Sequence, residues 1–277
     1  MSEGPTPPGA GAAPEDTYTH GHHESVLRSH TWRTVANSAP HLVAHLRPGL
    51  DVLDVGCGPG TITADLADRV APGRVVGLDR AEEVVARAAA TCADRPDVEI
   101  RVGDVYALPF ADGSFDVVHA HQVLQHLSDP VAALVEARRV CRPGGVVAVR
   151  DADYSAFAWA PADPDLDAWL ALYRAVARSN GAEPDAGPLL CGWARAAGFA
   201  EVEVTASAWC FATPEERTWW GELWAERTTS SALAEQAEAA GLATASEREA
   251  MADAFRRWAA ADDGVFVVPH TEVLARP

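Results

Sequence analysis

The sequence predicts an α/β fold with a doubly wound, mostly parallel β-sheet, and three observations support this expectation. Short apolar runs alternate with longer stretches of helical pattern between about residues 50 and 150. The first run, Val52–Val55, leads into a turn with glycine at every second position. Several later runs end in a polar residue, and a parallel sheet gathers such residues at one edge.

The glycine-rich turn at residues 56–61 is the most informative segment of the chain. Gly56, Gly58 and Gly60 have no Cβ, so the backbone can turn tightly and approach a bound molecule closely. The helix expected at 61–70 directs free N–H groups toward the same place. Such a turn fits a dinucleotide, a phosphate or an adenosine-containing cofactor, and the strands that follow distinguish between these.

Further polar residues are expected at the same edge of the sheet. The strand at 74–79 ends in Asp79, where a carboxylate can accept hydrogen bonds from both hydroxyls of a ribose. The strand at 98–102 leads to Asp104, a second carboxylate at this edge. The strand at 115–120 ends in His121 and Gln122.

A fifth strand at 145–150 completes the core after a turn that contains proline and two glycines. Helices are expected near 81–94 and 130–141, and Asp129 followed by Pro130 is a good start signal for the second of them.

The two flanks of this core have different patterns. Residues 1–16 are rich in Gly, Pro and Ala, which predicts a disordered tail. Residues 24–46 predict two helical pieces that break near Pro40. After the core we expect helices near 165–180 and 187–197, a strand at 201–206, a long helical segment at 214–261, and short strands at 265–268 and 272–274.

This ordered series resembles the class I S-adenosylmethionine-dependent methyltransferases, and among them the small-molecule group related to the ubiquinone and menaquinone biosynthesis methyltransferases. The resemblance covers about residues 41–150. It implies a seven-stranded, Rossmann-like methyltransferase sheet with an N-terminal helical lid. The family's sheet ends in an antiparallel pair of strands, and the helical insertion that splits this pair here is interpreted as a substrate cap before the last strand. The parts are then a tail at 1–16, the lid at 17–46, the cofactor-binding core at 47–150, and the rest of the sheet at 151–277 with the substrate cap at about 209–262.

The resemblance also implies a role for each part of the turn and sheet edge. The backbone at 54–60 holds the methionine end of the cofactor, Asp79 the ribose, and Asp104 the adenine amino group with the Val105 N–H nearby. A nicotinamide dehydrogenase is the main rival, but its usual Gly-x-Gly-x-x-Gly turn is absent. The expected cofactor-binding residues are Tyr18, His23, Asp54, Gly56, Cys57, Gly58, Gly60, Thr61, Asp79, Arg80, Gly103, Asp104, Val105, His121 and Gln122.

Histidines supply the candidate catalytic groups. His121 and His126 lie at or just after the fourth strand, where the family places its reacting centre, and a neutral histidine there can take a proton from the acceptor. The alternative for His126 is a packed histidine with no chemical role. The run that contains His20, His22 and His23 has no second cluster of metal-ligand spacing, so we expect a lid segment rather than a metal site, and no metal.

Tryptophans are frequent in the C-terminal half of the chain. Those of the cap region either pack the cap against the body or line an apolar pocket for a flat substrate. The residues concerned are Trp193, Trp209, Trp219, Trp220 and Trp224.

Composition excludes several classes of function. All 22 basic residues are arginine, so lysine Schiff-base or pyridoxal chemistry is excluded. The net charge of −18 argues against nucleic acid or an anionic membrane as partner. Five widely spaced cysteines without a Cys-x-x-Cys motif indicate reduced thiols, and with no signal peptide or membrane-spanning run they predict a cytoplasmic protein. The acidic composition neither requires nor forbids a homodimer.

The sequence therefore predicts a methyltransferase that moves a methyl group from S-adenosylmethionine to an O, N or C atom of a small, apolar or aromatic molecule. The step is an in-line displacement that leaves S-adenosylhomocysteine, and the protein supplies alignment and exclusion of water. Two alternatives stay open: a protein of this fold that catalyses another reaction, such as a cyclisation, and a non-catalytic accessory module.

Overall fold

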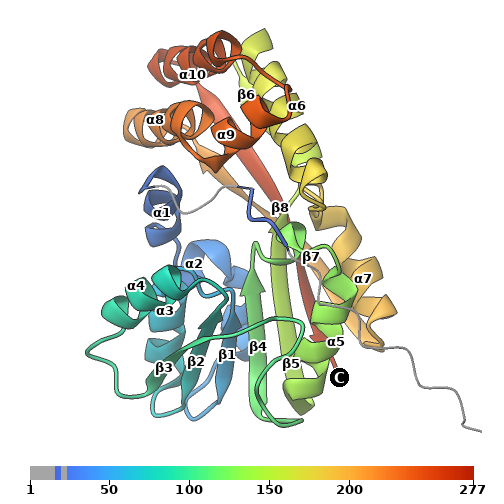
Figure 1. Ribbon diagram of the computed structural model, residues 1–277. Coiled ribbons are helices and arrows are strands. Elements are labelled where there is room, and N and C mark those ends of the chain that lie inside the picture. Colours follow the sequence, from blue (N-terminus) through green and yellow to red (C-terminus); the bar gives the residue numbers. More distant parts are fainter. Residues whose placement is uncertain (1–15, 20–23) are drawn as a thin grey trace, which may run out of the picture.

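The computed structural model describes residues 16–19 and 24–277, and it contains one large twisted sheet (Figure 1). Five parallel strands form its first half in the order β3-β2-β1-β4-β5, and the antiparallel strands β8 and β7 complete it. The predicted fold class is confirmed. The strands are β1 (Val52–Val55), β2 (Val75–Asp79), β3 (Val98–Val102), β4 (Phe115–His121), β5 (Cys141–Ala152), β6 (Ala158–Ala160), β7 (Glu201–Phe211) and β8 (Val265–Arg276).

Both faces of the parallel half are covered by helices, which explains the continuous apolar runs in its strands. Successive side chains of a strand point to opposite faces, so Leu53 packs with α5 and α7 while Val52 packs with α2, η1 and α3. The helices of this half are α3 (Thr61–Val70), α4 (Glu82–Thr91), η2 (Leu124–His126), α5 (Pro130–Val140), η4 (Gly187–Leu189) and α7 (Leu190–Ala196).

The N-terminal segment has three helical pieces rather than the predicted two. They are α1 (Glu24–Thr31), α2 (Val35–Ser38) and the 3₁₀ turn η1 (Pro40–His45). The additional break has a local cause, because Thr34 and Asn37 form a reciprocal capping box: the Asn37 N–H donates to Thr34 Oγ1 (3.3 Å) and the Thr34 N–H to Asn37 Oδ1 (2.8 Å). A helix must therefore start anew after Thr34.

The last two long strands correct the prediction in another respect. β7 continues to Phe211, five residues beyond the expected end at 206, and the two short strands expected at 265–268 and 272–274 are one strand, β8. Pro269 is tolerated inside β8 because it lies at the point where the pairing passes from β5 to β6. Its carbonyl accepts a hydrogen bond there from the Asp153 N–H (3.1 Å). In an antiparallel sheet the N–H and the C=O of one residue point toward the same neighbouring strand. The N–H that Pro269 lacks would therefore point into the gap between β5 and β6.

A helical cap stands at the far end of the sheet from the parallel strands (Figure 1). The chain leaves the sheet at Phe211 and returns at Phe266, which are register partners in β7 and β8. Three helices fill this insertion, and α6 from an earlier part of the chain packs with them around Trp169, Trp224 and Phe255. The elements are α6 (Pro164–Ser179), α8 (Pro214–Ser230), α9 (Ala232–Ala239) and α10 (Ala245–Ala260), with the short turn η3 (Tyr154–Ala156) leading to β6.

No helix among residues 16–19 and 24–277 is both long enough and apolar enough to cross a membrane.

Candidate active site

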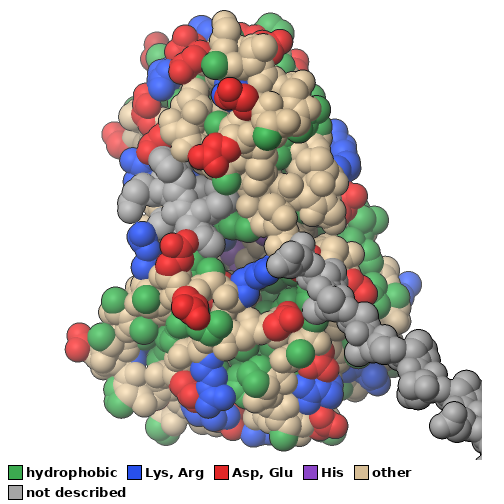
Figure 2. All heavy atoms as spheres, viewed as in Figure 1, with side chains coloured by type: hydrophobic (Ala, Val, Ile, Leu, Met, Phe, Trp, Pro, Cys, Tyr) green, Lys and Arg blue, Asp and Glu red, His purple; other side chains and the backbone are tan. Residues whose placement is uncertain are grey.

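A cavity of about 630 Å³ lies between the carboxyl edge of the parallel strands, the helix α1 and the cap. Its opening is visible between the lower and upper parts of the molecule, with a histidine side chain inside (Figure 2). Of the residues expected to bind the cofactor, all that lie in the described ranges line this cavity except Gly60. Gly60 instead begins α3 as its N-cap residue, and His23 lies outside the described residues.

The glycine-rich turn forms the floor of the cavity, and its three glycines adopt a left-handed backbone that favours glycine. Gly56 and Gly58 have φ values of 66° and 55°. A Cβ on Gly56 would lie 2.4 Å from the side chain of Val123, so only glycine fits there. A Cβ on Gly58 would have only His30 Nδ1 nearby, at 3.9 Å, so this part of the turn is open toward the cavity.

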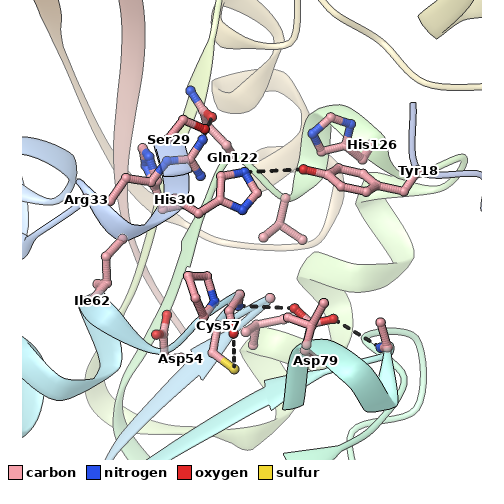
Figure 3. A pocket seen from close by; sticks show the side chains of 18 of the residues that line it. Tyr18, Ser29, His30, Arg33, Asp54, Cys57, Ile62, Asp79, Gln122 and His126 are labelled. Carbon is pink, nitrogen blue, oxygen red and sulfur yellow. Dashed lines mark hydrogen bonds between the residues drawn. The ribbon is translucent and has the colours of Figure 1, made fainter. Parts of the chain in front are cut away.

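The helix α1 is tied down over this floor. The Thr61 hydroxyl, at the start of α3, donates to the His30 carbonyl (3.1 Å). His30 Nε2 lies 3.4 Å from the hydroxyl of Tyr18 (Figure 3). Residues from the N-terminal segment therefore lie against the turn.

Asp79 ends β2 at the side of the turn. Its carboxylate accepts from the N–H groups of Gly58 and Ala81, both at 3.2 Å (Figure 3). The Gly103 N–H donates to the Asp79 carbonyl (3.0 Å), which brings the end of β3 to the same place. Asp104 is exposed at the rim, where its carboxylate accepts from the Tyr106 N–H (2.9 Å).

Arg80, which follows Asp79, donates to the carbonyl of Asp16 at 2.8 Å. This contact joins the N-terminal segment to the rim near Asp79. Arg80 therefore contributes to the cavity rim where β2 ends.

Asp54 is 2% exposed, and its carboxylate is already committed inside the protein. The Thr63 hydroxyl donates to one oxygen (2.6 Å), and His119 Nδ1 lies 2.8 Å from the other. Asp54 thus fixes the turn to α3 and β4. Sequence reasoning did not single out His119, since an apolar strand with one histidine carries no signal for this pair. Burial raises the pKa of the neighbouring Cys57 thiol, so it is not a reactive thiolate.

His121 lies in the cavity wall at the end of β4 and is 5% exposed. Within the described part of the chain, neither of its ring nitrogens has a hydrogen-bond partner. Burial, reinforced by Arg33, lowers the pKa of His121 well below its usual value, so the imidazole is neutral. Its free nitrogens can accept a hydrogen bond from a bound molecule, while the lowered pKa makes the ring a weak base.

Gln122 follows with a left-handed backbone, φ 54°, which is uncommon outside glycine. The strained conformation is held by its side chain: Arg33 Nη2 donates to Oε1 (2.7 Å), and Nε2 lies 2.8 Å from His270 Nε2. His270 Nδ1 lies 2.9 Å from the Val268 carbonyl, so the series runs from Arg33 to the backbone of β8.

His126 packs against Tyr18, with ring centroids 4.8 Å apart in an edge-to-face arrangement (Figure 3). Burial lowers the pKa of His126 to about 3 and raises the pKa of Tyr18 to about 12. Both groups are therefore neutral, and they form a wall between the lid and the turn that follows β4.

The cap side of the cavity is aromatic. Trp32 and Trp209 pack edge to face at 5.3 Å, and Trp220 stacks on Phe211 at 4.2 Å. Four of the five tryptophans singled out in the sequence line the cavity and also pack the cap, whereas Trp193 packs under α5. Two arginines on this side, Arg33 and Arg227, had no sequence signal.

Groups of three or more His, Cys, Asp or Glu arranged to hold a metal ion do not occur within the described ranges.

Comparison with known proteins agrees with this geometry. A sequence model described as "Methyltransferase domain" matches residues 53–149. An uncharacterised methyltransferase of Schizosaccharomyces pombe is 38% identical over 226 residues, which are 77% of this chain and 80% of that protein. The demethylmenaquinone methyltransferase of Beutenbergia cavernae is 45% identical over 115 residues, 42% of this chain and 45% of that enzyme.

Among solved structures, the 4+2 cyclase SpnF is similar with a TM-score of 0.51 and 25% identity, over 86% of this chain and 80% of that one.

The glycine-rich turn, the carboxylate after β2 and the match over most of the S. pombe relative agree with one another. The chain belongs to the class I S-adenosylmethionine-dependent methyltransferases.

Proposed function

We propose that this methyltransferase acts on a small, flat and mostly apolar acceptor that lies between the sheet edge and the cap. The observation that carries the proposal is the continuity of the cavity: the same space of about 630 Å³ touches the glycine-rich turn and the aromatic cap wall. This volume lies within the roughly 300–1,000 Å³ typical of small-molecule sites. Donor and acceptor can therefore meet in one enclosed space.

The residues of the floor fit the donor. The open turn at Gly58 would hold the methionine end, Asp79 the ribose hydroxyls, and Asp104 with the Val105 N–H the adenine. When bound, S-adenosylmethionine supplies an electrophilic methyl group on a cationic sulfur. The remaining floor and wall residues would complete this subsite: Tyr18, Asp54, Gly56, Cys57, Thr61, Arg80, Gly103, His121 and Gln122.

The chain contributes alignment, exclusion of water and a proton acceptor. The lid residue Tyr18 and the cap tryptophans enclose the cavity, which excludes competing water. His121 would accept the proton of an acceptor hydroxyl, amine or carbon acid, because it lies in the cavity wall and its nitrogens have no other partner in the described residues. Its lowered pKa makes it a weak base, so this role suits an acidic acceptor group. His126, which is packed against Tyr18, would shape the wall.

The finer grouping with the ubiquinone and menaquinone biosynthesis methyltransferases belongs to the same proposal. The identity of 45% to a demethylmenaquinone methyltransferase supports it, although that match covers 42% of this chain. That match covers less than half of either protein, so the acceptor is inferred from the cavity rather than from this relative.

A second candidate is a cyclisation in a protein of this fold. The likeness to SpnF, which extends over 86% of the chain, favours it. The same enclosed aromatic cavity would then fold a flexible apolar substrate without consuming the donor.

The deciding experiment is a thermal-shift titration with S-adenosylmethionine, S-adenosylhomocysteine and NADH, followed by an acceptor screen that measures release of S-adenosylhomocysteine. A ligand at a hundredfold of its dissociation constant stabilises the folded chain by about 2.7 kcal/mol, which raises Tm by a few degrees. A shift with the sulfur nucleosides and turnover with an acceptor supports methyl transfer. Product formation without release of S-adenosylhomocysteine favours the cyclisation, and a shift with NADH alone contradicts the proposal.

A further inference from the structure

Arg33 is a cation of the cavity wall that has no acidic partner among the residues that the structure describes. It follows α1 in the chain, and its Nη2 donates to the neutral side chain of Gln122 (2.7 Å). Its Nε is buried and has no partner, and no carboxylate of the described residues lies within ion-pair distance of it. The Arg33 side chain as a whole is half-buried. Arg150, which is 1% exposed, differs because it is paired with Glu272 at 3.3 Å. An arginine is rarely buried without an acid unless something else supplies the negative charge.

The surroundings of Arg33 belong to the acceptor side of the cavity. Its guanidinium carbon lies 5.6 Å from the centre of the Trp209 ring. In Figure 3 it lies with Gln122 and Ser29, across the cavity from Cys57 and Asp79. His30, three residues earlier in the chain, is the residue that approaches the glycine-rich turn. Arg33 therefore faces the aromatic wall rather than the floor.

A second arginine stands on the same side. Arg227 of α8 is 3% exposed, lines the cavity, and donates to the Ser29 hydroxyl. The charge of Arg33 contributes to lowering the pKa of Arg227, so the two guanidinium groups repel each other across a poorly solvated space. An anion bound beside Arg33 relieves this repulsion.

The carboxyl groups near Arg33 do not supply that anion. Asp151 acts on Arg33 electrostatically, but burial raises its pKa to about 7, so it is only partly ionised at neutral pH. The remaining carboxylates of the cavity, such as Asp54 and Asp79, belong to the floor and have hydrogen-bond donors of their own. The cavity thus has an acidic floor, which suits a cationic donor, and a basic aromatic roof.

We propose that the acceptor carries an anionic oxygen group, a carboxylate or an acidic phenolate or enolate, on its flat apolar body, and that Arg33 binds this group with Arg227 beside it. The inference rests on the proposed function, because it assigns the acceptor side of the same cavity. Guanidinium groups bind carboxylates in a planar, two-pronged geometry, and the tryptophan rings cover the apolar body. The net charge of −18 repels an anion at long range, so the attraction comes from the arginines of the roof themselves.

The test uses the complex of the full chain with S-adenosylhomocysteine and a series of one- to three-ring aromatic carboxylic acids, each matched with its neutral primary amide. Calorimetry should show that the best acids bind about tenfold or more tightly than their amides. In Arg33→Gln this preference should disappear, and in Arg33→Lys, which keeps the charge but not the planar geometry, it should be reduced. Arg28→Gln is the matched control: it lies on α1 with the same change of charge, but pairs with Glu226 on the surface, and it should keep the preference.

The outcomes separate this inference from the proposed function. Failure of the wild-type chain to bind S-adenosylhomocysteine contradicts the proposed function itself. If the nucleoside binds but no acid of the series binds better than its amide, the inference is wrong. If Arg33→Gln instead weakens S-adenosylhomocysteine about tenfold and leaves the acid preference intact, Arg33 holds the donor's own carboxylate, which also overturns it.

Discussion

His119 and Asp54 are register partners on the parallel strands β4 and β1, and their side chains meet with Nδ1 2.8 Å from Oδ1. Asp54 directly precedes the residues that enter the glycine-rich turn, so this buried pair holds the floor of the cavity to the centre of the sheet. Its other oxygen accepts from Thr63 in α3, and one carboxylate therefore joins three elements.

Replacing His119 with Leu should destabilise the fold. Asp54 would keep only its bond from Thr63, and a buried carboxylate that loses a partner costs about 3 kcal/mol. Urea unfolding measures the change. Asp54→Asn in the same background should restore part of the loss, because the neutral amide is cheaper to leave partly unpaired; a fully additive double variant would show that the two residues do not interact.

Asp79→Ala should remove cofactor affinity while the fold survives. If the carboxylate binds the ribose, its loss raises the dissociation constant of S-adenosylhomocysteine about a hundredfold or more. Stability should fall by only about 1–2 kcal/mol, because the N–H groups of Gly58 and Ala81 lose a partner near solvent. Isothermal calorimetry and thermal unfolding test the two parts separately. Undiminished affinity would take Asp79 out of the ribose subsite.

His121→Phe keeps an aromatic ring in the wall but removes the proton acceptor. We expect kcat to fall about a hundredfold, with the affinity for S-adenosylhomocysteine within about twofold. Because the pKa of His121 lies well below its usual value, the wild-type rate should show no acid limb near pH 6.5. The same change at His126 serves as the comparison, and an equal loss of kcat at both positions would contradict a specific role for His121.

Stability should fall in mild acid. Burial lowers the pKa of His41 and His126 to about 4 and 3, and the pKa values of His121 and His270 well below the usual range. The unfolded chain therefore binds protons first as pH falls below about 6.5, and each histidine removes about 1.3 kcal/mol between about pH 7 and 5.5. Asp151 acts in the opposite direction, because its pKa is raised to about 7 and its protonation in the folded chain adds roughly 1.6 kcal/mol.

The net loss should be about 3–4 kcal/mol, measured by urea unfolding at the two pH values. His126→Gln carries no titrating proton, so it should lower this loss by about 1.3 kcal/mol. A loss that is the same in the variant would mean that His126 titrates normally in the folded chain.

Two helical glycines should respond to alanine in opposite ways. A Cβ on Gly221 in α8 would lie 2.8 Å from the Ala259 Cβ and 3.0 Å from the Phe255 carbonyl oxygen, so α8 and α10 must separate. Gly221→Ala should therefore destabilise by about 1–3 kcal/mol. Gly192 in α7 has nothing within 4 Å, and Gly192→Ala should stabilise by about 0.5–1 kcal/mol. Equal effects in thermal unfolding would disprove the close approach of the two helices.

The parallel half of the fold could be predicted because its signals are local. The helix expected at 61–70 has those bounds in the structure, since the glycine turn before it and the alternation of apolar residues fix both ends. β7 was predicted too short because its residues after 206 are paired by β8, a strand distant in sequence. Likewise, β8 can continue through Pro269 only because this residue lies between the parts of β8 that pair with β5 and with β6.

The floor of the cavity was predictable for the same reason, whereas its roof was not. Asp79 and Asp104 follow strands directly, so topology alone brings them together. Arg33 and Arg227 come from segments almost two hundred residues apart, and only the packing of α1 against the cap places both beside one cavity. The role of His119 could not be predicted from the sequence, because only the strand register places it opposite Asp54.

The cap helices α8, α9 and α10 form an insertion between two adjacent strands, β7 and β8. Because Phe211 and Phe266 are partners in adjacent strands, the chain departs and rejoins at nearly one point, and a segment of another length leaves the strand pairing unchanged. Trp219, Trp220 and Trp224, which line the cavity, belong to that segment. A single exchange of this insert, by recombination or by protein engineering, would therefore combine the same floor with a different acceptor specificity.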